Sequence, residues 1–169
     1  TSFGHGITTT PLQLAKAYSI ISNGGYDIKP SLINSGESKI RTQILNENVS
    51  KNINNILRKV VSSKEGTAHF ADVYGYEVGG KTGTADKVKN GIYTKDKINT
   101  FVSVFPISNP KFVLLVLLDE PKPSKEYIYH YRDERTPYKG NWRNTAGWTT
   151  VLIVGNIIEK IGPILATKY

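Results

Sequence analysis

Cysteine and methionine are both absent from this sequence of 169 residues. Without cysteine the chain has no disulfide, no thiolate nucleophile and no cysteine-ligated metal site. Because the chain begins at Thr1 and holds no methionine, we expect a processed product or a piece of a longer protein. Long apolar runs are also missing, since residues 112–118 and 151–158 fall well short of the roughly 20 residues of a membrane-spanning helix. These two runs predict a buried strand and a core-facing helix.

Acidic residues are few. The chain has 14 of them and 22 basic residues, so its net charge is +8. The basic residues are scattered along the chain, and no RNA-binding or zinc-finger signature accompanies them. We therefore interpret the charge as a basic soluble surface and predict no nucleic-acid partner. His5, His69 and His130 lie far apart and lack metal-ligand spacing, so we predict neither a metal site nor a cofactor.

Apolar periodicity and terminal signals predict three helices. The first begins after Thr10, which can form a capping box with Gln13, and ends at residues 23–25. The second covers residues 48–63, and the third covers residues 147–161. The apolar stripe of the second helix is predicted to comprise Val49, Ile53, Ile56, Leu57, Val60 and Val61.

Strands are predicted at residues 76–85, 98–105 and 112–118. Asn90-Gly91 indicates a loop or hairpin tip between the first two strands. The short turn at residues 106–110 predicts that the last two strands pair antiparallel. The last strand is continuously apolar, which is typical of a strand covered on both faces.

Two segments remain irregular in this interpretation. One or two short strands are predicted near residues 39–45. Residues 121–144 are polar and rich in tyrosine, and they predict a long surface loop. The cluster at residues 127–131, with Arg132 and Arg135 nearby, favours a solvated insertion; a partner-binding loop is the alternative.

The stretch Gly80-Lys81-Thr82-Gly83-Thr84 carries the chemistry. Lys81 supplies a cation that can hold a substrate carboxylate and ease the deprotonation of a nearby hydroxyl. Thr82 and Thr84 alternate with Lys81 and Gly83, so the two sets of side chains lie on opposite faces of the strand. Gly83 lets an extended substrate approach the strand edge, and the amide beyond it can point at a developing oxyanion. Taken alone, the triplet also fits a Gly-rich strand end with a solvated lysine.

Further motifs surround this strand in a fixed order. They are Ser2-Phe3-Gly4, Gly6, Thr10-Pro11-Leu12-Gln13-Leu14-Ala15, Ala17-Tyr18, Asn23-Gly24-Gly25, Gly66-Thr67-Ala68 and Asp119-Glu120-Pro121-Lys122. The series resembles the class B penicillin-binding proteins, most closely the division-type enzymes of Gram-negative bacteria. The resemblance implies an α+β fold of the β-lactamase/transpeptidase type, with an antiparallel five-stranded sheet flanked by helices. Residues 1–169 would be the C-terminal portion of that domain, with three strands and the last helix.

The resemblance also implies an activity, peptidoglycan D,D-transpeptidation in septal wall synthesis. An active-site serine attacks a D-Ala-D-Ala stem peptide, the acyl-enzyme passes to an amine, and penicillins trap that acyl-enzyme. By the same resemblance Lys81 is catalytic, lying beside the nucleophile and helping to bind the substrate carboxylate. The Thr82 hydroxyl binds that carboxylate, Gly83 keeps the space clear, and Thr84 supplies a backbone amide to the oxyanion hole. No cofactor is implied.

The implied partners are peptidoglycan stem peptides, β-lactam antibiotics and other divisome proteins. The implied location is the periplasmic face of the inner membrane, with a membrane anchor upstream of this chain. Three alternatives stay open. The first is a β-lactamase, carboxypeptidase or β-lactam sensor on the same fold, the second is a non-catalytic scaffold, and the weakest is a nucleic-acid binder.

The Ser-x-x-Lys and Ser-x-Asn motifs of the family are expected upstream of this chain. Residues 108–111 and 50–52 match their letters, but we interpret both matches as accidental. Pro110 argues against a helix at the first match, and helix capping would explain Ser50 in the second. Alone, the chain is expected neither to acylate with penicillin nor to fold stably, because its apolar strand would lack cover.

Overall fold

The computed structural model describes residues 7–33, 41–124, 126, 128, 130, 137 and 142–169. Its elements in chain order are α1 (Pro11–Ser22), α2 (Glu47–Ser62), the 3-10 helix η1 (His69–Ala71), β1 (Gly79–Lys89), β2 (Ile92–Phe105), β3 (Phe112–Asp119), the 3-10 helix η2 (Ala146–Trp148) and α3 (Thr150–Lys168). The capping box that begins α1 is present as predicted, with Thr10 and Gln13 each accepting a backbone amide of the other. The series of α-helices and β-strands therefore follows the order that the sequence predicts.

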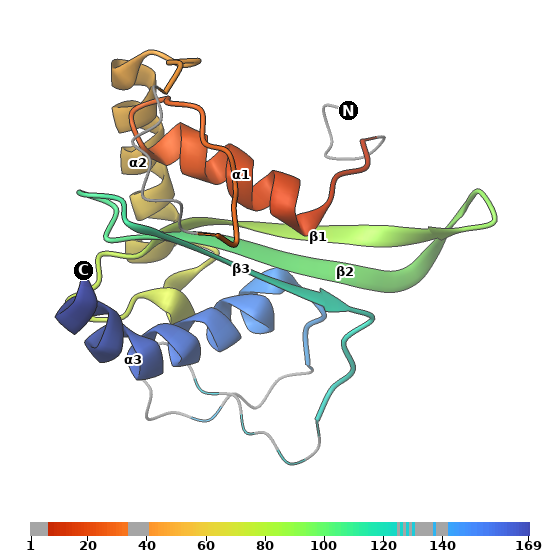
Figure 1. The fold of residues 1–169 in the computed structure, drawn as a ribbon. Coiled ribbons are helices and arrows are strands. Elements are labelled where there is room, and N and C mark those ends of the chain that lie inside the picture. Colours follow the sequence, from red (N-terminus) through yellow and green to blue (C-terminus); the bar gives the residue numbers. More distant parts are fainter. Residues whose placement is uncertain are drawn as a thin grey trace.

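The three strands form one antiparallel sheet in the order β1-β2-β3. Asn90 and Gly91 have φ angles of 53° and 77° and join β1 to β2, as their sequence predicts, because such a two-residue turn needs positive φ at both positions. The register places Lys81 opposite Val102. Since β2 begins at Ile92 rather than at residue 98, the hairpin extends beyond β3, as Figure 1 shows.

The helices cover opposite faces of the sheet (Figure 1). Val104 on β2 packs with Leu57 of α2 and Tyr18 of α1 on one face. Phe101 and Phe105 point to the other face, where α3 lies. Even and odd positions of β2 therefore face different layers, and β1 follows the same alternation through its register.

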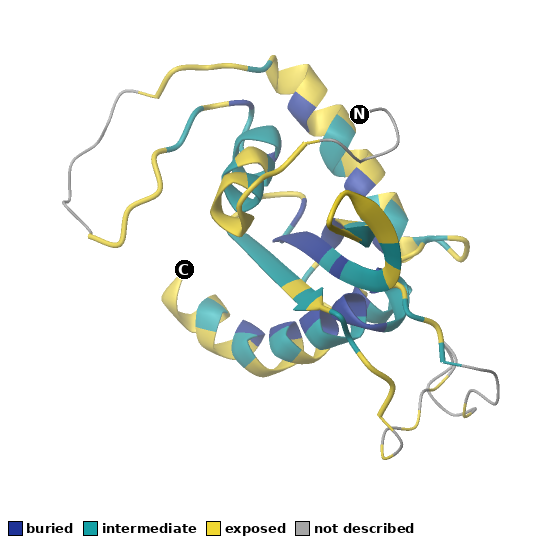
Figure 2. Cartoon of the chain, turned by 90° about the vertical axis from the view of Figure 1, so that its right-hand side faces the viewer, coloured by how far each residue is buried: buried dark blue, intermediate teal, exposed yellow. Residues whose placement is uncertain are grey.

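The main core lies between the sheet and α3. Val151, Val154 and Ile158 are fully buried there, and the exposed residues of α3 alternate with them in Figure 2. The core-facing helix predicted near residues 151–158 is confirmed, but it continues to Lys168. By length and composition α3 is the single helix of the described residues that could cross a membrane. One face of α3, with Val151, Val154 and Ile158, packs in the core.

The apolar stripe predicted for α2 is partly wrong. Val49 and Ile56 are 45% and 60% exposed, because α2 packs through the row of Ser50, Leu57 and Val61 instead. The capping role predicted for Ser50 is also wrong, since Asn46 caps α2. The buried Ser50 hydroxyl instead donates to the Ile21 carbonyl and accepts from the Gly24 amide, which joins α2 to the end of α1.

Two strand predictions also need correction. β3 was expected to be covered on both faces, but its apolar residues are mostly half-buried and Leu117 is 42% exposed, because α1 and α3 cover it only in part. Among residues 41–45 the structure has one isolated bridge, from Gln43 to Tyr26, in place of a strand. Residues 39 and 40, most of the loop at 121–144, and the motif at residues 2–6 with His5 lie outside the described residues.

Candidate functional site

The site predicted on residues 80–84 lies on β1, at an edge of the sheet. β2 pairs with one side of β1, and in the part of the chain that the structure describes no strand pairs with the other side. Backbone groups at such an edge can hydrogen-bond to an extended ligand. The geometry therefore allows a peptide to lie along Lys81, Thr82, Gly83 and Thr84.

Lys81 and Gly83 lie on the α1 face of β1, opposite Val102 and Thr100. The Lys81 side chain is exposed, and its ammonium donates to the Thr82 carbonyl at 2.7 Å. Lys81 forms no ion pair with any of the described carboxylates. Its charge is therefore available to an anionic ligand.

Thr82 and Thr84 lie on the opposite face, as the alternation predicts. The Thr82 hydroxyl is 3.0 Å from the Thr67 hydroxyl, and either oxygen can be the donor. The Thr84 hydroxyl accepts from the Ala146 amide at 3.0 Å, at the beginning of η2. The two threonine side chains thus hold β1 to the loop after α2 and to the segment that leads into α3.

A groove with a volume of about 780 Å³ runs along this strand. The lining comes from the approach to α1, α1 itself, β1 and the neighbouring strands, and includes Thr8, Leu14, Tyr18, Lys81, Thr82, Gly83, Thr84, Lys87, Thr100 and Leu117. Burial raises the pKa of the Tyr18 phenol, which therefore stays neutral at ordinary pH. The groove brings together all four residues that the sequence predicts for the site.

The two glycines of the motif have different surroundings. A Cβ on Gly80 would lie 2.5 Å from the Val102 carbonyl oxygen and 2.6 Å from the Phe101 ring. A Cβ on Gly83 would meet nothing closer than 3.9 Å, where Thr100 lies. Gly80 is therefore needed for packing, whereas the absence of a side chain at Gly83 leaves space in the groove.

A cluster of ion pairs at the far end of the groove was missed by the sequence analysis. Lys87 contacts Asp119 at 2.8 Å and Glu120 at 2.9 Å, and Lys89 contacts Glu120 at 3.0 Å and Asp96 at 2.7 Å. The register of β1 shifts between Asp86 and Val88, which indicates a bulge near Lys87. Two carboxylates of this cluster, Asp119 and Glu120, belong to a motif that the sequence analysis named, but the motif did not indicate their lysine partners.

The ion pairs shift the pKa values of the cluster. Hydrogen bonds from Lys87 and Lys89, of which that from Lys87 has the larger effect, lower the pKa of Glu120 to about 2. Hydrogen bonds to Asp119 and Glu120 raise the pKa of Lys87, and the hydrogen bond from Lys89 lowers that of Asp96. Glu120, Lys87 and Asp96 are therefore charged at neutral pH, and the ion pairs of the cluster join the hairpin to the end of β3.

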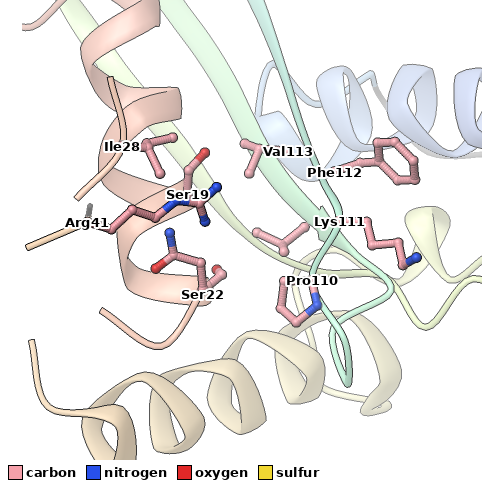
Figure 3. Close-up of a pocket in the computed structure, with 10 residues that line it drawn as sticks. Ser19, Ser22, Ile28, Arg41, Pro110, Lys111, Phe112 and Val113 are labelled. Carbon is pink, nitrogen blue, oxygen red and sulfur yellow. The ribbon is translucent and has the colours of Figure 1, made fainter. Parts of the chain in front are cut away.

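A second, smaller hollow of about 220 Å³ lies between the end of α1 and the beginning of β3 (Figure 3). Arg41 and Lys111 both contribute to its lining. Lys111 extends away from Arg41, and its ammonium donates to the carbonyl of Tyr169. Because the two cations do not converge, this hollow lacks the features of an anion site.

The two motif matches that we interpret as accidental lie apart from the groove. Ser108 is in the turn between β2 and β3, as predicted, where its hydroxyl donates to the Glu77 carboxylate. Ser50 is buried between α1 and α2. Among the described residues, no group of three His, Asp or Glu side chains could hold a metal ion.

Comparison with known proteins gives one consistent result. Residues 1–136 match the family described as the penicillin binding protein transpeptidase domain. The chain is 34% identical to a probable peptidoglycan D,D-transpeptidase FtsI of Caulobacter vibrioides, over 99% of this chain and 28% of that protein. It is 33% identical to stage V sporulation protein D of Bacillus subtilis, over 99% of this chain and 25% of that protein. The chain therefore spans under a third of the length of these relatives.

The fold is similar to a solved structure, the apo form of the TP domain from Burkholderia pseudomallei penicillin-binding protein 3. The TM-score is 0.67 at 28% identity, over 95% of this chain and 45% of that chain. The predicted α+β fold, an antiparallel sheet flanked by helices, is confirmed.

Proposed function

Because this chain belongs to the family of penicillin-binding protein transpeptidase domains, we propose that it forms the C-terminal portion of a peptidoglycan D,D-transpeptidase domain. In this proposal the chain supplies one wall of the active site. The nucleophilic serine, in a Ser-x-x-Lys motif, and the Ser-x-Asn motif come from a part of the protein upstream of Thr1. The names of the curated relatives support the activity, and the match to less than half of the neighbouring domain supports a missing portion.

The proposed reaction has two steps. In the first, the serine hydroxyl gives its proton to a base and its oxygen bonds to the carbonyl carbon of the penultimate D-Ala. The terminal D-Ala leaves with a proton as a free amine, and an ester remains on the enzyme. In the second, an acceptor amine attacks the ester, an amide forms, and the serine oxygen regains its proton. A β-lactam takes the place of the stem peptide in the first step. Its opened ring then stays attached to the serine as an ester.

The residues of β1 have separate parts in this reaction. Lys81 lowers the free energy of the deprotonated serine and attracts the substrate carboxylate. The Thr82 hydroxyl donates to that carboxylate, and Gly83 leaves the groove clear. The Thr84 amide donates to the oxyanion of the tetrahedral intermediate. The observation that carries the proposal is the position of Lys81, exposed in a groove at the open edge of β1 and without a described carboxylate partner.

The biological setting is proposed from the relatives. The donor and acceptor are peptidoglycan stem peptides, and the reaction cross-links septal cell wall. A membrane anchor upstream of this chain would hold the domain at the periplasmic face of the inner membrane, next to other divisome proteins. The share of the relatives' length that this chain leaves uncovered has room for the anchor and the remaining motifs.

The test is covalent labelling of the complete protein with a fluorescent penicillin. We expect one stable adduct on a serine of a Ser-x-x-Lys motif, because deacylation by water is slow in a transpeptidase. Lys81→Ala should abolish labelling. Lys95→Ala is the matched control, since Lys95 is also an exposed lysine of the same hairpin but lies outside the groove.

Three results would contradict the proposal. Labelling that persists unchanged in Lys81→Ala would remove Lys81 from the mechanism. Steady turnover of penicillin would identify a β-lactamase or carboxypeptidase on the same fold. A complete protein that takes no label and has no serine motif would be a non-catalytic scaffold.

A further inference from the structure

Two threonine hydroxyls contact each other beside the groove, and the proposed function uses only one of them. Thr67 follows α2, and Thr82 is on β1, yet their Oγ1 atoms are 3.0 Å apart. Thr82 lines the groove, whereas Thr67 does not. The contact with Thr82 therefore links Thr67 to a ligand in the groove.

The backbone around Thr67 is held from both sides. A Cβ on Gly66 would lie 2.2 Å from the Val60 carbonyl oxygen, so only glycine allows the loop to lie against the end of α2. A Cβ on Gly147 would lie 2.7 Å from the Thr67 carbonyl oxygen, so η2 also packs directly on this residue. Ala68 is fully buried, and its amide donates to Val60 at 3.2 Å. Thr67 is thus exposed but fixed in position.

A hydroxyl has one proton to donate and two lone pairs that can accept. If Thr82 donates to Thr67, it has no proton left for a ligand. If Thr67 donates to Thr82, the Thr82 proton is free to point at an anion in the groove. A bound carboxylate therefore favours the second arrangement, and the Thr67 hydrogen bond holds the Thr82 hydroxyl in the orientation that donates.

We propose that Thr67 is a positioning residue, which orients the Thr82 hydroxyl toward the carboxylate of the stem peptide or of a β-lactam. This inference rests on the proposed function, in which Thr82 binds that carboxylate. It adds a function for the Gly66-Thr67-Ala68 motif, because the two small neighbours of Thr67 allow the close packing that fixes its hydroxyl.

The experiment measures the second-order rate of acylation of the complete protein by benzylpenicillin. Thr67→Val keeps the branched shape and removes the hydroxyl, and we expect a fall of about three- to tenfold, the effect of one hydrogen bond. Thr67→Ser restores the hydroxyl and should restore the rate. Thr82→Val should lower the rate at least as much as Thr67→Val, and the double variant should be no slower than Thr82→Val alone.

A ligand control separates positioning from general damage to the site. The methyl ester of benzylpenicillin has no carboxylate charge, so Thr67→Val should change its acylation rate much less. An unchanged rate in Thr67→Val, an equal loss with the ester, or additive losses in the double variant would each overturn the inference. Failure of the wild-type protein to acylate at all would instead reject the proposed function.

Discussion

Lys81 and Lys87 lie on the same strand and line the same groove, but their partners differ. Lys87 contacts Asp119 and Glu120, and these hydrogen bonds raise its pKa. Lys81 has only the Thr82 carbonyl as a hydrogen-bond acceptor among the described residues. The charge of Lys87 is therefore used to hold the hairpin to β3, whereas that of Lys81 stays available. The partners of a lysine, more than its position in a groove, indicate whether it can act on a ligand.

The largest expected difference is in the rate of penicillin acylation, when Lys81 and Lys87 are each replaced by arginine. Arginine keeps the charge but replaces a compact ammonium by a wide planar group. We expect Lys81→Arg to lower penicillin acylation of the complete protein by about a hundredfold or more, because the wider cation would not fit beside the proposed serine. Lys87→Arg should stay within about twofold of wild type, since guanidinium also pairs with carboxylates.

The rates of labelling with a fluorescent penicillin check this prediction. Equal losses in the two variants would mean that the ion-pair cluster is as necessary for acylation as Lys81. If both variants kept the wild-type labelling rate, Lys81 would contribute only its charge.

Gly80 and Gly83 offer a second comparison, which separates folding from ligand access. Gly80→Ala should destabilise the protein by about 1–3 kcal/mol, because the new Cβ would overlap the Val102 carbonyl and the Phe101 ring. Gly83→Ala has space for its Cβ, so its free energy of unfolding should stay within about 1 kcal/mol of wild type while acylation falls. Chemical denaturation and labelling, measured side by side, check both parts. A stable Gly80→Ala variant would contradict the packing shown here.

Local signals predicted much of this fold from the sequence. The capping box at Thr10, the Asn90-Gly91 turn and the alternation along β1 each depend on neighbouring residues, and the structure confirms all three. The family resemblance, which rested on the ordered series of motifs from Ser2 to Lys122, is confirmed as well. The roles assigned to the four residues of β1 remain predictions, because they depend on a bound substrate and on the proposed nucleophilic serine.

The wrong predictions share a physical reason, which is dependence on contacts far away in the sequence. Periodicity showed that α2 is amphipathic but did not show which row of side chains meets the sheet, so Val49 and Ile56 were assigned to the core. The ion pair of Lys87 with Asp119 joins β1 to β3, which are not neighbours in the sheet, and no local pattern indicates that pairing. Leu117 on β3 is exposed because α1 and α3, which lie far from it in the sequence, cover the strand only in part.

Thr84 allows the side chain and the backbone of one site residue to be separated. Its hydroxyl accepts from the Ala146 amide, and Ala146 is fully buried, so loss of the hydroxyl leaves a buried donor without a partner. We expect Thr84→Val to lower the free energy of unfolding by about 1–2 kcal/mol and Thr84→Ser to restore it. The backbone amide proposed for the oxyanion hole remains in both variants, so acylation should fall far less than in Lys81→Arg. A loss of acylation without a loss of stability would show that the hydroxyl itself contacts the ligand.

The smallest effect is expected at Glu120, and it should depend on pH. Because the folded state lowers the pKa of Glu120 to about 2, the stability contributed by this carboxylate is present above its ordinary pKa and is lost as the pH falls toward the folded value. Wild type should therefore melt a few degrees above Glu120→Gln at neutral pH, and the difference should shrink between about pH 4 and pH 2. Thermal unfolding across this range provides the check, and Glu126→Gln is a control at an exposed glutamate that forms no ion pair with the described residues. A difference that stays constant down to pH 2 would mean that the contribution of Glu120 does not come from its charge.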